Sequence, residues 1–275
     1  MINVGIQASV VAILAFGMTF VIITGGIDLS VGSVAAFAAI IAAWSGAQAG
    51  LPDLLALIVG LLAGALAGGV NALMISFGRI PSFIATLAML SVGRGLTLVI
   101  SDGSPIATSE LVTFFGSRLG GWLPVPIVVM VVMGVLAAVI LNRTIAGRAM
   151  YAIGGNEEVA RLSGLPVRRT LMYVYMLAGL FAATAGIVLS GRLSSAQPQA
   201  AAGYELDAIA AVVIGGSSLS GGVGKISGTF VGALVLAVIR NGLNLLNVNP
   251  FWQQVAIGVV IALAVLTDSL RPRSS

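Results

Sequence analysis

Long runs of apolar residues, separated by short polar turns, dominate the sequence. A run must reach about 20 residues to cross a bilayer as a helix. On that scale the pattern predicts about nine transmembrane segments. They are 5–24, 31–46, 54–77, 82–100, 125–142, 170–190, 205–220, 228–246 and 252–268. We therefore expect an all-α, polytopic membrane helical bundle that forms a single transmembrane domain over residues 1–275.

Two of these segments, 31–46 and 205–220, are short for a full crossing. Non-helical backbone is tolerated at membrane depth where protein covers it, so we expect short, broken or re-entrant helices there. Residues 25–32 and 215–222 also share the pattern GG-x-x-L-S-x-G, beside these segments. Glycine-interrupted repeats often lie near a transport path, although chance or a shared turn type explains so short a match equally well. The candidate pathway or helix-break residues are Asp28, Ser30, Ser218, Ser220, Asn241 and Asn244.

Composition supports a membrane protein and excludes several kinds of chemistry. The chain is 59% hydrophobic and 8% charged, whereas soluble domains carry about 25% charged residues. It contains no cysteine and no histidine, which excludes disulfides, thiolate metal sites and imidazole catalysis. Gly224 and Lys225 do not form a phosphate-binding loop, because Ile226 stands where serine or threonine is required. We therefore expect no catalytic residues, no bound cofactor and no ATP site on this chain.

The basic residues predict the orientation of the chain in the membrane. Segment 143–169 is the densest basic loop, and most other bases fall on the same side of the predicted bundle. These bases are Arg79, Arg143, Arg148, Arg161, Arg168, Arg169, Lys225, Arg271 and Arg273. The opposite side holds Arg118 and Arg192. Because cytoplasmic loops carry the excess of arginine and lysine, we expect this loop and the C-terminus in the cytoplasm.

A short helix is predicted inside the basic loop. Asn156 is a candidate N-cap, and the two acids that follow it suit the positive end of a helix dipole. Gly164 and Pro166 end the helix. Its expected apolar face is Val159, Leu162 and Leu165. A helix of about two turns is marginal alone. It therefore packs either on a partner or only on its own bundle.

Several charged residues lie at or within the predicted spans. Asp28 is expected to cap the following helix together with Ser30, or to contact a transport path. We expect Arg94 to reach outward along its stem or to pair with Asp102 or Glu110. Glu205 and Asp207 begin a span on the outer side, where they either favour the helix dipole or contact an external partner with Arg192.

Glycine is abundant in the predicted spans. The chain contains 36 glycines, and the run 60–69 repeats them at helical spacing. Small residues let helix backbones approach closely. This run therefore predicts either tight packing within one subunit or a dimer face or moving helix.

Collinear segments along nearly the whole chain resemble a known family. They are 26–33 (GIDLSVGS), 83–87 (FIATL), 154–157 (GGNE), 161–164 (RLSG), 192–198 (RLSSAQP), 203–213 (GYELDAIAAVV) and 241–246 (NGLNLL). Together they make the chain similar to the permeases of ATP-binding-cassette (ABC) importers, and within that group to the ribose-type sugar permeases.

The resemblance implies a mechanism and a set of partners. Such a permease forms a homodimer in the bacterial inner membrane, binds a cytoplasmic ABC ATPase and receives sugar from an extracytoplasmic binding protein. It implies about ten spans, so we expect this chain to lack the first helix. Loop 143–169 becomes the coupling loop. The implied ATPase-coupling residues are Gly155, Asn156, Glu157, Glu158, Ala160, Arg161 and Gly164. The implied binding-protein contacts are Arg192, Glu205 and Asp207.

The expected function is import of a monosaccharide, a pentose or a hexose, by alternating access. Related permeases share the loop pattern, so branched-chain amino acids, nucleosides or inositol-like ligands are alternatives. An ion-coupled secondary transporter would need carboxylates in mid-span, whereas most acids here fall at span ends. No nucleic-acid partner is expected, because the bases lie in short loops between apolar runs.

Overall fold

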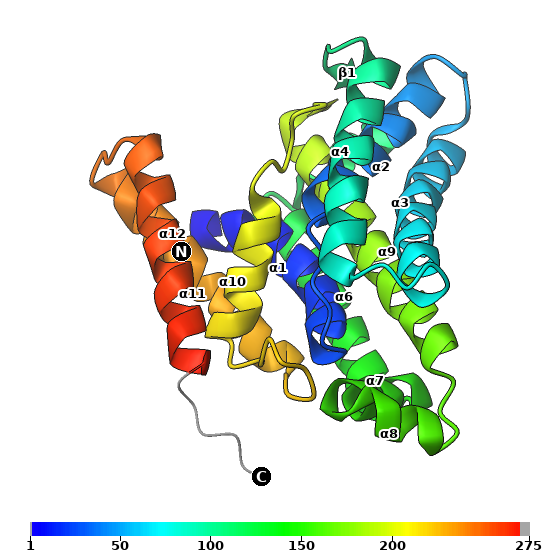
Figure 1. The fold of residues 1–275 in the computed structure, drawn as a ribbon. Helices are drawn as coiled ribbons and strands as arrows, with labels where there is room; N and C mark the ends of the chain where they lie inside the picture. The colour runs from blue at the N-terminus through cyan, green and yellow to red at the C-terminus, as the bar shows by residue number, and fades with distance from the viewer. Residues whose placement is uncertain (1, 270–275) are drawn as a thin grey trace.

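The computed structural model describes residues 2–269 and consists mainly of long helices (Figure 1). The long helices and the half-length α10 match the nine predicted segments in order. They are α1 (Ile2–Ile23), α2 (Val31–Ala47), α3 (Asp53–Ser76), α4 (Ser82–Ser101), α6 (Val125–Arg143), α9 (Val167–Leu193), α10 (Tyr204–Ile214), α11 (Ile226–Leu245) and α12 (Pro250–Ser269). The all-α membrane bundle is therefore confirmed.

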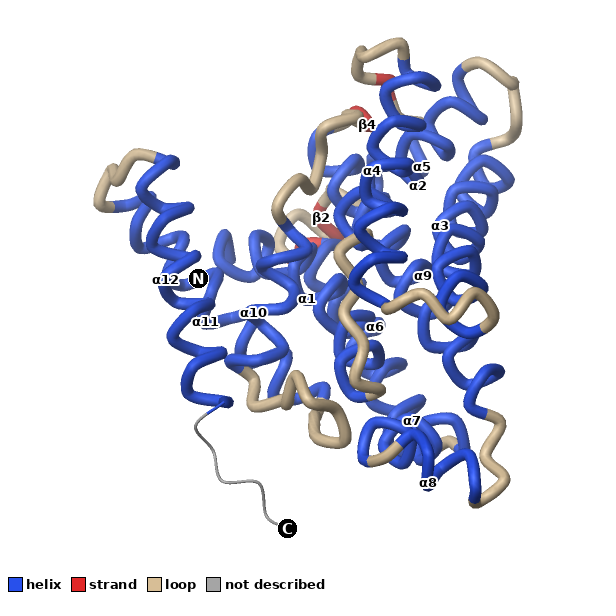
Figure 2. Tube along the Cα trace, in the orientation of Figure 1, coloured by secondary structure: helices blue, strands red, loops and turns tan. Residues whose placement is uncertain are grey.

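Short elements connect these helices. The short helices are α5 (Glu110–Phe114), α7 (Ile145–Gly155) and α8 (Glu157–Leu162). The strands are β1 (Ile106–Ala107), β2 (Arg118–Leu119), β3 (Leu123–Pro124) and β4 (Ser195–Ala196). They form two antiparallel ribbons, β1 with β4 and β2 with β3, which are red in Figure 2. The sequence pattern predicted neither ribbon.

Among the described residues, six helices are long and apolar enough to cross a membrane. Helix α10 has 11 residues. At 1.5 Å per residue it is about 16 Å long, roughly half of a bilayer core of about 30 Å. The backbone leaves the helix at Gly215 and Gly216, and Gly216 has a φ of 87°. The predicted short segment 205–220 is therefore a half-length helix followed by a turn.

Helix α1 is the central helix of the bundle. It packs against α6, α9, α10 and α11, and Figure 1 shows it, in dark blue, among them. Phe16 and Phe20 are fully buried, and the Phe20 ring meets Phe181 of α9 edge-on at 5.7 Å. Because a helix buried on most sides needs no polar stripe, the sequence of α1 is mainly apolar, with isolated polar residues that include Gln7, Ser9 and Thr19.

The glycine run in α3 packs within the chain. A Cβ on Gly60 would lie 2.8 Å from the carbonyl oxygen of Ala38, and one on Gly64 would lie 2.7 Å from that of Gly179. A Cβ on Gly68 would overlap the carbonyl of Tyr175. These three glycines therefore bring α3 against α2 and α9, and the alternative of a dimer face is wrong for them.

The connecting segments gather at the two ends of the bundle. We call the end that carries α8 the α8 end; it also holds the turns 24–30, 77–81 and 215–225. We call the other end the ribbon end, because β1 and β4 pair there through Ile106 and Ala196. This alternation agrees with the predicted order of spans. The predicted basic tail, with Arg271 and Arg273, lies outside the described residues.

Candidate functional site

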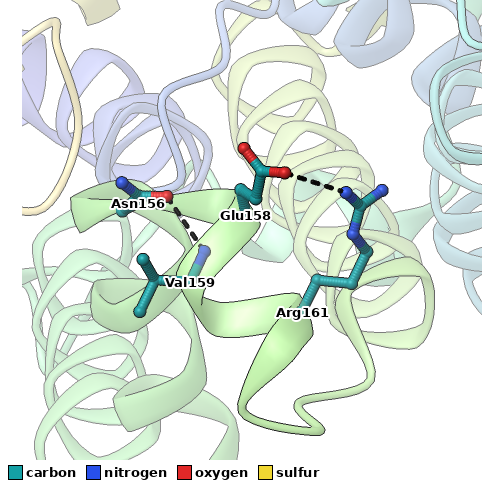
Figure 3. A network of polar contacts seen from close by, with 4 residues as sticks. All are labelled: Asn156, Glu158, Val159 and Arg161. Carbon is teal, nitrogen blue, oxygen red and sulfur yellow. Dashed lines mark hydrogen bonds and ion pairs between the residues drawn. The ribbon is translucent and has the colours of Figure 1, made fainter.

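Helix α8 is a capped helix between α7 and α9 (Figure 3). The side-chain oxygen of Asn156 accepts a hydrogen bond from the backbone N–H of Val159 at 3.0 Å. This confirms the predicted N-cap, which satisfies one of the free donors of the first turn. Glu158 and Arg161 form an ion pair at 3.7 Å with exposed side chains, so it contributes little stability.

The end of α8 also follows the prediction. Gly164 has a φ of 82°, and the N–H of Leu165 bonds the carbonyl of Ala160 at 3.1 Å. This is a glycine-terminated helix end, in which a left-handed residue lets the chain turn back. Nothing lies within 4 Å of a Cβ placed on Gly164, so the backbone conformation, not space, is what favours glycine.

The packed face of α8 differs from the predicted apolar face. Ala160 is 3% exposed and clusters with Ile153 of α7 and Val167 of α9, and Leu165 packs on this cluster. Val159 and Leu162 instead are 56% and 79% exposed. Val159 and Leu162 of the predicted apolar face therefore point outward, whereas Leu165 turns towards the bundle. Helix α8 rests on its own bundle through Ala160 and presents two apolar side chains outward.

Helix α7 lies within the predicted loop 143–169 and joins α8 to the bundle. Thr144 caps it by accepting a hydrogen bond from the N–H of Gly147 at 3.1 Å. The hydroxyl of Tyr151 donates to the carbonyl of Gly224 at 2.7 Å. A Cβ on Gly154 would overlap the carbonyl oxygen of Ile23, the last residue of α1. Helix α7 is thus seated directly on the end of α1, and α8 packs on α7 and α9.

The two repeat segments meet at this same point. The N–H of Gly222 donates to the carbonyl of Ile23 at 2.9 Å, and a Cβ on Gly221 would lie 3.0 Å from the nitrogen of Gly25. Ser218 and Ser220 lie in the turn after α10, where the N–H of Ser220 bonds the Ser218 hydroxyl at 3.3 Å. The repeats therefore mark two helix breaks that lie side by side.

Asp28 closes the turn before α2 and does not cap that helix. Its carboxylate accepts from the N–H of Ser30 at 2.8 Å and from the Ser30 hydroxyl at 2.6 Å. Asn71 of α3 donates to the same hydroxyl at 2.8 Å. Neither side chain bonds the first turn of α2, so the predicted cap is wrong. Burial raises the pKa of the Asp28 carboxyl.

A large cavity opens at the α8 end, between α8, the start of α9 and the turn that precedes α4. Its volume is about 920 Å³. The charged residues that line it are Arg79, Glu157, Arg161, Arg168 and Arg169. The Arg168 guanidinium lies over the Phe77 ring at 5.3 Å. The surroundings of α8 are therefore strongly cationic.

Arg94 takes different partners from those predicted. Its guanidinium donates to the backbone carbonyls of Pro198 and Ala200 at 2.7 and 2.9 Å. Pairing with Asp102 or Glu110 is therefore wrong. The arginine thereby holds the segment before α10 against α4. Its two hydrogen bonds satisfy backbone carbonyls that would otherwise be unpaired.

The predicted external contacts lie partly inside the protein. Asp207 is 3% exposed, and its carboxylate accepts a hydrogen bond from Arg240 of α11 at 2.6 Å. This burial contradicts a contact of Asp207 with an external protein. Glu205 faces α2, where a Cβ on Gly32 would lie 2.5 Å from its carboxylate. Arg192 donates to the carbonyl of Ile6 at 3.3 Å.

The Asp207–Arg240 pair borders a second cavity, of about 200 Å³, towards the ribbon end. Its other polar lining residues are Gln7, Arg192, Tyr204, Asn244 and Gln253. We call it the ribbon-end cavity. It unites three of the predicted residues, Arg192, Asp207 and Asn244, whereas Asn241 does not line it. Arg240 is the one feature of the sequence that could have indicated this cavity, because it lies inside the predicted span 228–246 and an ionisable residue inside a span points to function.

Comparison with known proteins gives a consistent assignment. A family model described as branched-chain amino acid transport system / permease component matches residues 1–265. The chain is 49% identical over 267 residues to the ribose import permease protein RbsC of Bacillus subtilis strain 168, which covers 95% of this chain and 82% of that protein. It is 47% identical over 272 residues to RbsC of Escherichia coli K12, covering 97% and 84%. It is 40% identical over 283 residues to the L-arabinose transport system permease protein AraH of Escherichia coli K12, covering 99% and 83%. No solved structure matches significantly.

Proposed function

This chain belongs to the family of branched-chain amino acid transport system permease components, and from that membership we propose that it is the transmembrane subunit of an ATP-driven monosaccharide importer. The sugar assignment rests on relatives whose names specify ribose and L-arabinose and which share 40–49% identity with it. A pentose is therefore the first substrate to test.

The observation that carries this proposal is the outward-facing apolar surface of α8. The helix is capped at both ends and seated through Ala160, so its conformation does not depend on a partner. Val159 and Leu162 nevertheless point away from the bundle. An apolar pair on a preformed helix among cationic residues fits insertion into a groove of a cytoplasmic ATPase.

The proposed orientation follows from charge. Arg79, Arg168 and Arg169 surround the large cavity at the α8 end, and excess arginine and lysine marks cytoplasmic loops. The α8 end then faces the cytoplasm, and the ribbon end faces the extracytoplasmic binding protein. Two copies of the chain form the transmembrane unit. Closure of the ATPases pushes on α8 and shifts the bundle between outward and inward states as rigid bodies.

Reconstitution tests the function directly. The chain is assembled in proteoliposomes with its ABC ATPase and its sugar-binding protein, and uptake of radiolabelled D-ribose and L-arabinose is followed with ATP or ADP. We expect uptake that needs ATP and the binding protein. Uptake that survives without ATP but collapses with an uncoupler would instead identify an ion-coupled transporter. Uptake of radiolabelled leucine or isoleucine without pentose uptake would favour transport of branched-chain amino acids, the substrates in the description of the family.

The coupling role of α8 has its own test. Gly164→Val places a β-branched residue at a φ of 82°, and Glu157→Lys reverses a charge in the first turn of α8. We expect both variants to lose ATPase association and uptake. Retention of both properties in both variants contradicts coupling through α8.

A further inference from the structure

We propose that the ribbon-end cavity binds the transported monosaccharide through its hydroxyl groups as the sugar leaves the binding protein. This inference rests on the proposed function and adds the site at which the permease itself contacts the sugar. Neither the family membership nor the relatives' names assign any residue to such contact.

The lining of the cavity matches the chemistry of a sugar. One part is polar and comes from five helices. Its residues are Gln7 of α1, Arg192 of α9, Tyr204 and Asp207 of α10, Arg240 and Asn244 of α11, and Gln253 of α12. Amide side chains both donate and accept hydrogen bonds, as hydroxyl groups do, so each can pair with a hydroxyl in either role. Bonds to the charged groups are stronger than bonds between neutral ones.

The remaining lining is apolar. Ala8, Val11, Ala233, Leu236 and Ala237 form it. A pyranose or furanose ring presents C–H groups on its faces and hydroxyls at its edge. A cavity with an apolar wall and convergent polar groups is the usual form of a small-molecule site.

Charge and size fit a neutral sugar. Asp207 and Arg240 neutralise each other at 2.6 Å, so that pair presents polar atoms without a net charge. The third charged residue of the lining, Arg192, donates to the backbone carbonyl of Ile6 and is a further hydrogen-bond donor at the wall. The Arg240 guanidinium also lies 5.9 Å from the centre of the Tyr204 ring, which holds both side chains at the wall. The volume of about 200 Å³ equals that of roughly seven water molecules at about 30 Å³ each, which is a space suited to one pentose.

The position of the cavity fits a transport route. It lies beside the first turn of α10, the half-length helix, and half-length helices commonly line the substrate path of transporters. It is near the ribbon end, which faces the binding protein in the proposed orientation. A buried ion pair without a neighbouring cavity would have only a structural role. The Asp207–Arg240 pair borders an open volume, which provides room for a ligand.

Two variants and two matched controls test the inference in the complete transporter. Gln7→Met removes a lining amide at nearly constant volume, and Ala237→Leu fills the cavity. Gln199→Met is the control for Gln7→Met, because Gln199 is exposed and lies outside the cavity. Ala88→Leu is the control for Ala237→Leu, because Ala88 lies on the exposed face of α4. Initial rates of ATP-dependent uptake are measured over a range of D-ribose and of a second pentose that the same binding protein delivers. Rates are normalised to the complex that co-purifies with the ATPase.

We expect Gln7→Met to lower the maximum rate roughly threefold to tenfold, the order for loss of one hydrogen bond to a ligand. The half-saturating concentration should stay constant, because the binding protein sets it in the proposed mechanism. The ratio of the two pentose rates should change, since a lost amide affects sugars with different hydroxyl geometry unequally. We expect Ala237→Leu to block uptake more strongly, and both controls to behave as the unaltered transporter does.

The opposite results are equally clear. Equal rates in the unaltered transporter and in Gln7→Met overturn the inference. A rate loss of the same size for both pentoses also overturns it, because such a loss indicates a structural effect of the substitution and not a contact with the sugar. If Ala237→Leu does not assemble, Gln7→Met decides alone. An unaltered transporter that takes up no pentose with ATP overturns the proposed function, and the sugar assignment of the cavity with it.

Discussion

Truncation of Leu162 to alanine should weaken binding of the ATPase without unfolding α8. Leu162 is 79% exposed and does not belong to the cluster that seats the helix, whereas Ala160 does. Alanine has the highest helix propensity, so the substitution does not oppose the helix. The cap formed by Asn156 is also untouched. A loss of affinity would therefore report the surface that α8 presents, not the fold of the loop.

The expected size follows from the exposure. Full burial of a leucine side chain is worth about 1.5–3 kcal/mol. At 79% exposure, most of that area is still available to a partner, and alanine keeps the Cβ. We therefore expect the variant to lose about 1–2 kcal/mol of binding free energy, roughly a fivefold to thirtyfold rise in Kd.

The assay titrates the detergent-solubilised chain with the purified ATPase and measures Kd by biolayer interferometry. Uptake is the second readout. Leu246→Ala is the matched control, because Leu246 is 75% exposed but lies at the ribbon end. Its Kd should be unchanged. An unchanged Kd for Leu162→Ala would refute the docking of α8, and an equal rise for both variants would show a general effect of surface truncation.

Three further predictions concern stability, measured as melting temperature in detergent. Gly68→Ala sets a methyl group against a backbone carbonyl of α9 and should cost about 1–3 kcal/mol, whereas Gly95→Ala, with nothing within 4 Å, should stabilise by up to about 1 kcal/mol. Because burial raises the pKa of Asp28, the folded chain loses stability as pH rises through that pKa; Asp28→Asn keeps an acceptor and should flatten the profile of melting temperature against pH. Arg240→Met should cost about 3 kcal/mol by leaving Asp207 unpaired, and adding Asp207→Leu should recover much of that loss.

The lengths of the apolar runs were sufficient to predict the main helices. The predicted segment 82–100 corresponds to α4, Ser82–Ser101, because Pro81 and the turn after Ser101 bound an apolar run whose single charged residue is Arg94. The ribbon of β1 and β4 could not be predicted. Each strand has two residues, which is too few for any alternation to be visible, and Ile106 and Ala196 are far apart in the sequence.

Local features of the candidate site could be predicted, and non-local ones could not. The Asn156 cap and the Gly164 end depend on residues within one or two turns, so the sequence specifies them directly. The outward direction of Leu162 depends on which face the bundle covers. Spacing of apolar residues identifies a face but not whether the chain itself or a partner buries it. The ribbon-end cavity needs side chains from α1, α9, α10, α11 and α12, which only the tertiary fold brings together.

The position of α1 explains how a push on α8 reaches the rest of the molecule in the proposed cycle. Its last carbonyl, at Ile23, is the contact point for Gly154 of α7 and for Gly222 after α10. Because α6, α9, α10 and α11 pack around α1 on all sides, it cannot shift past them without opening a closely packed core. In the proposed cycle, force applied at α8 would therefore pass through α7 and move these helices as a unit. Gln7 lies on the same helix and lines the ribbon-end cavity, so that unit joins α8 to the proposed sugar site.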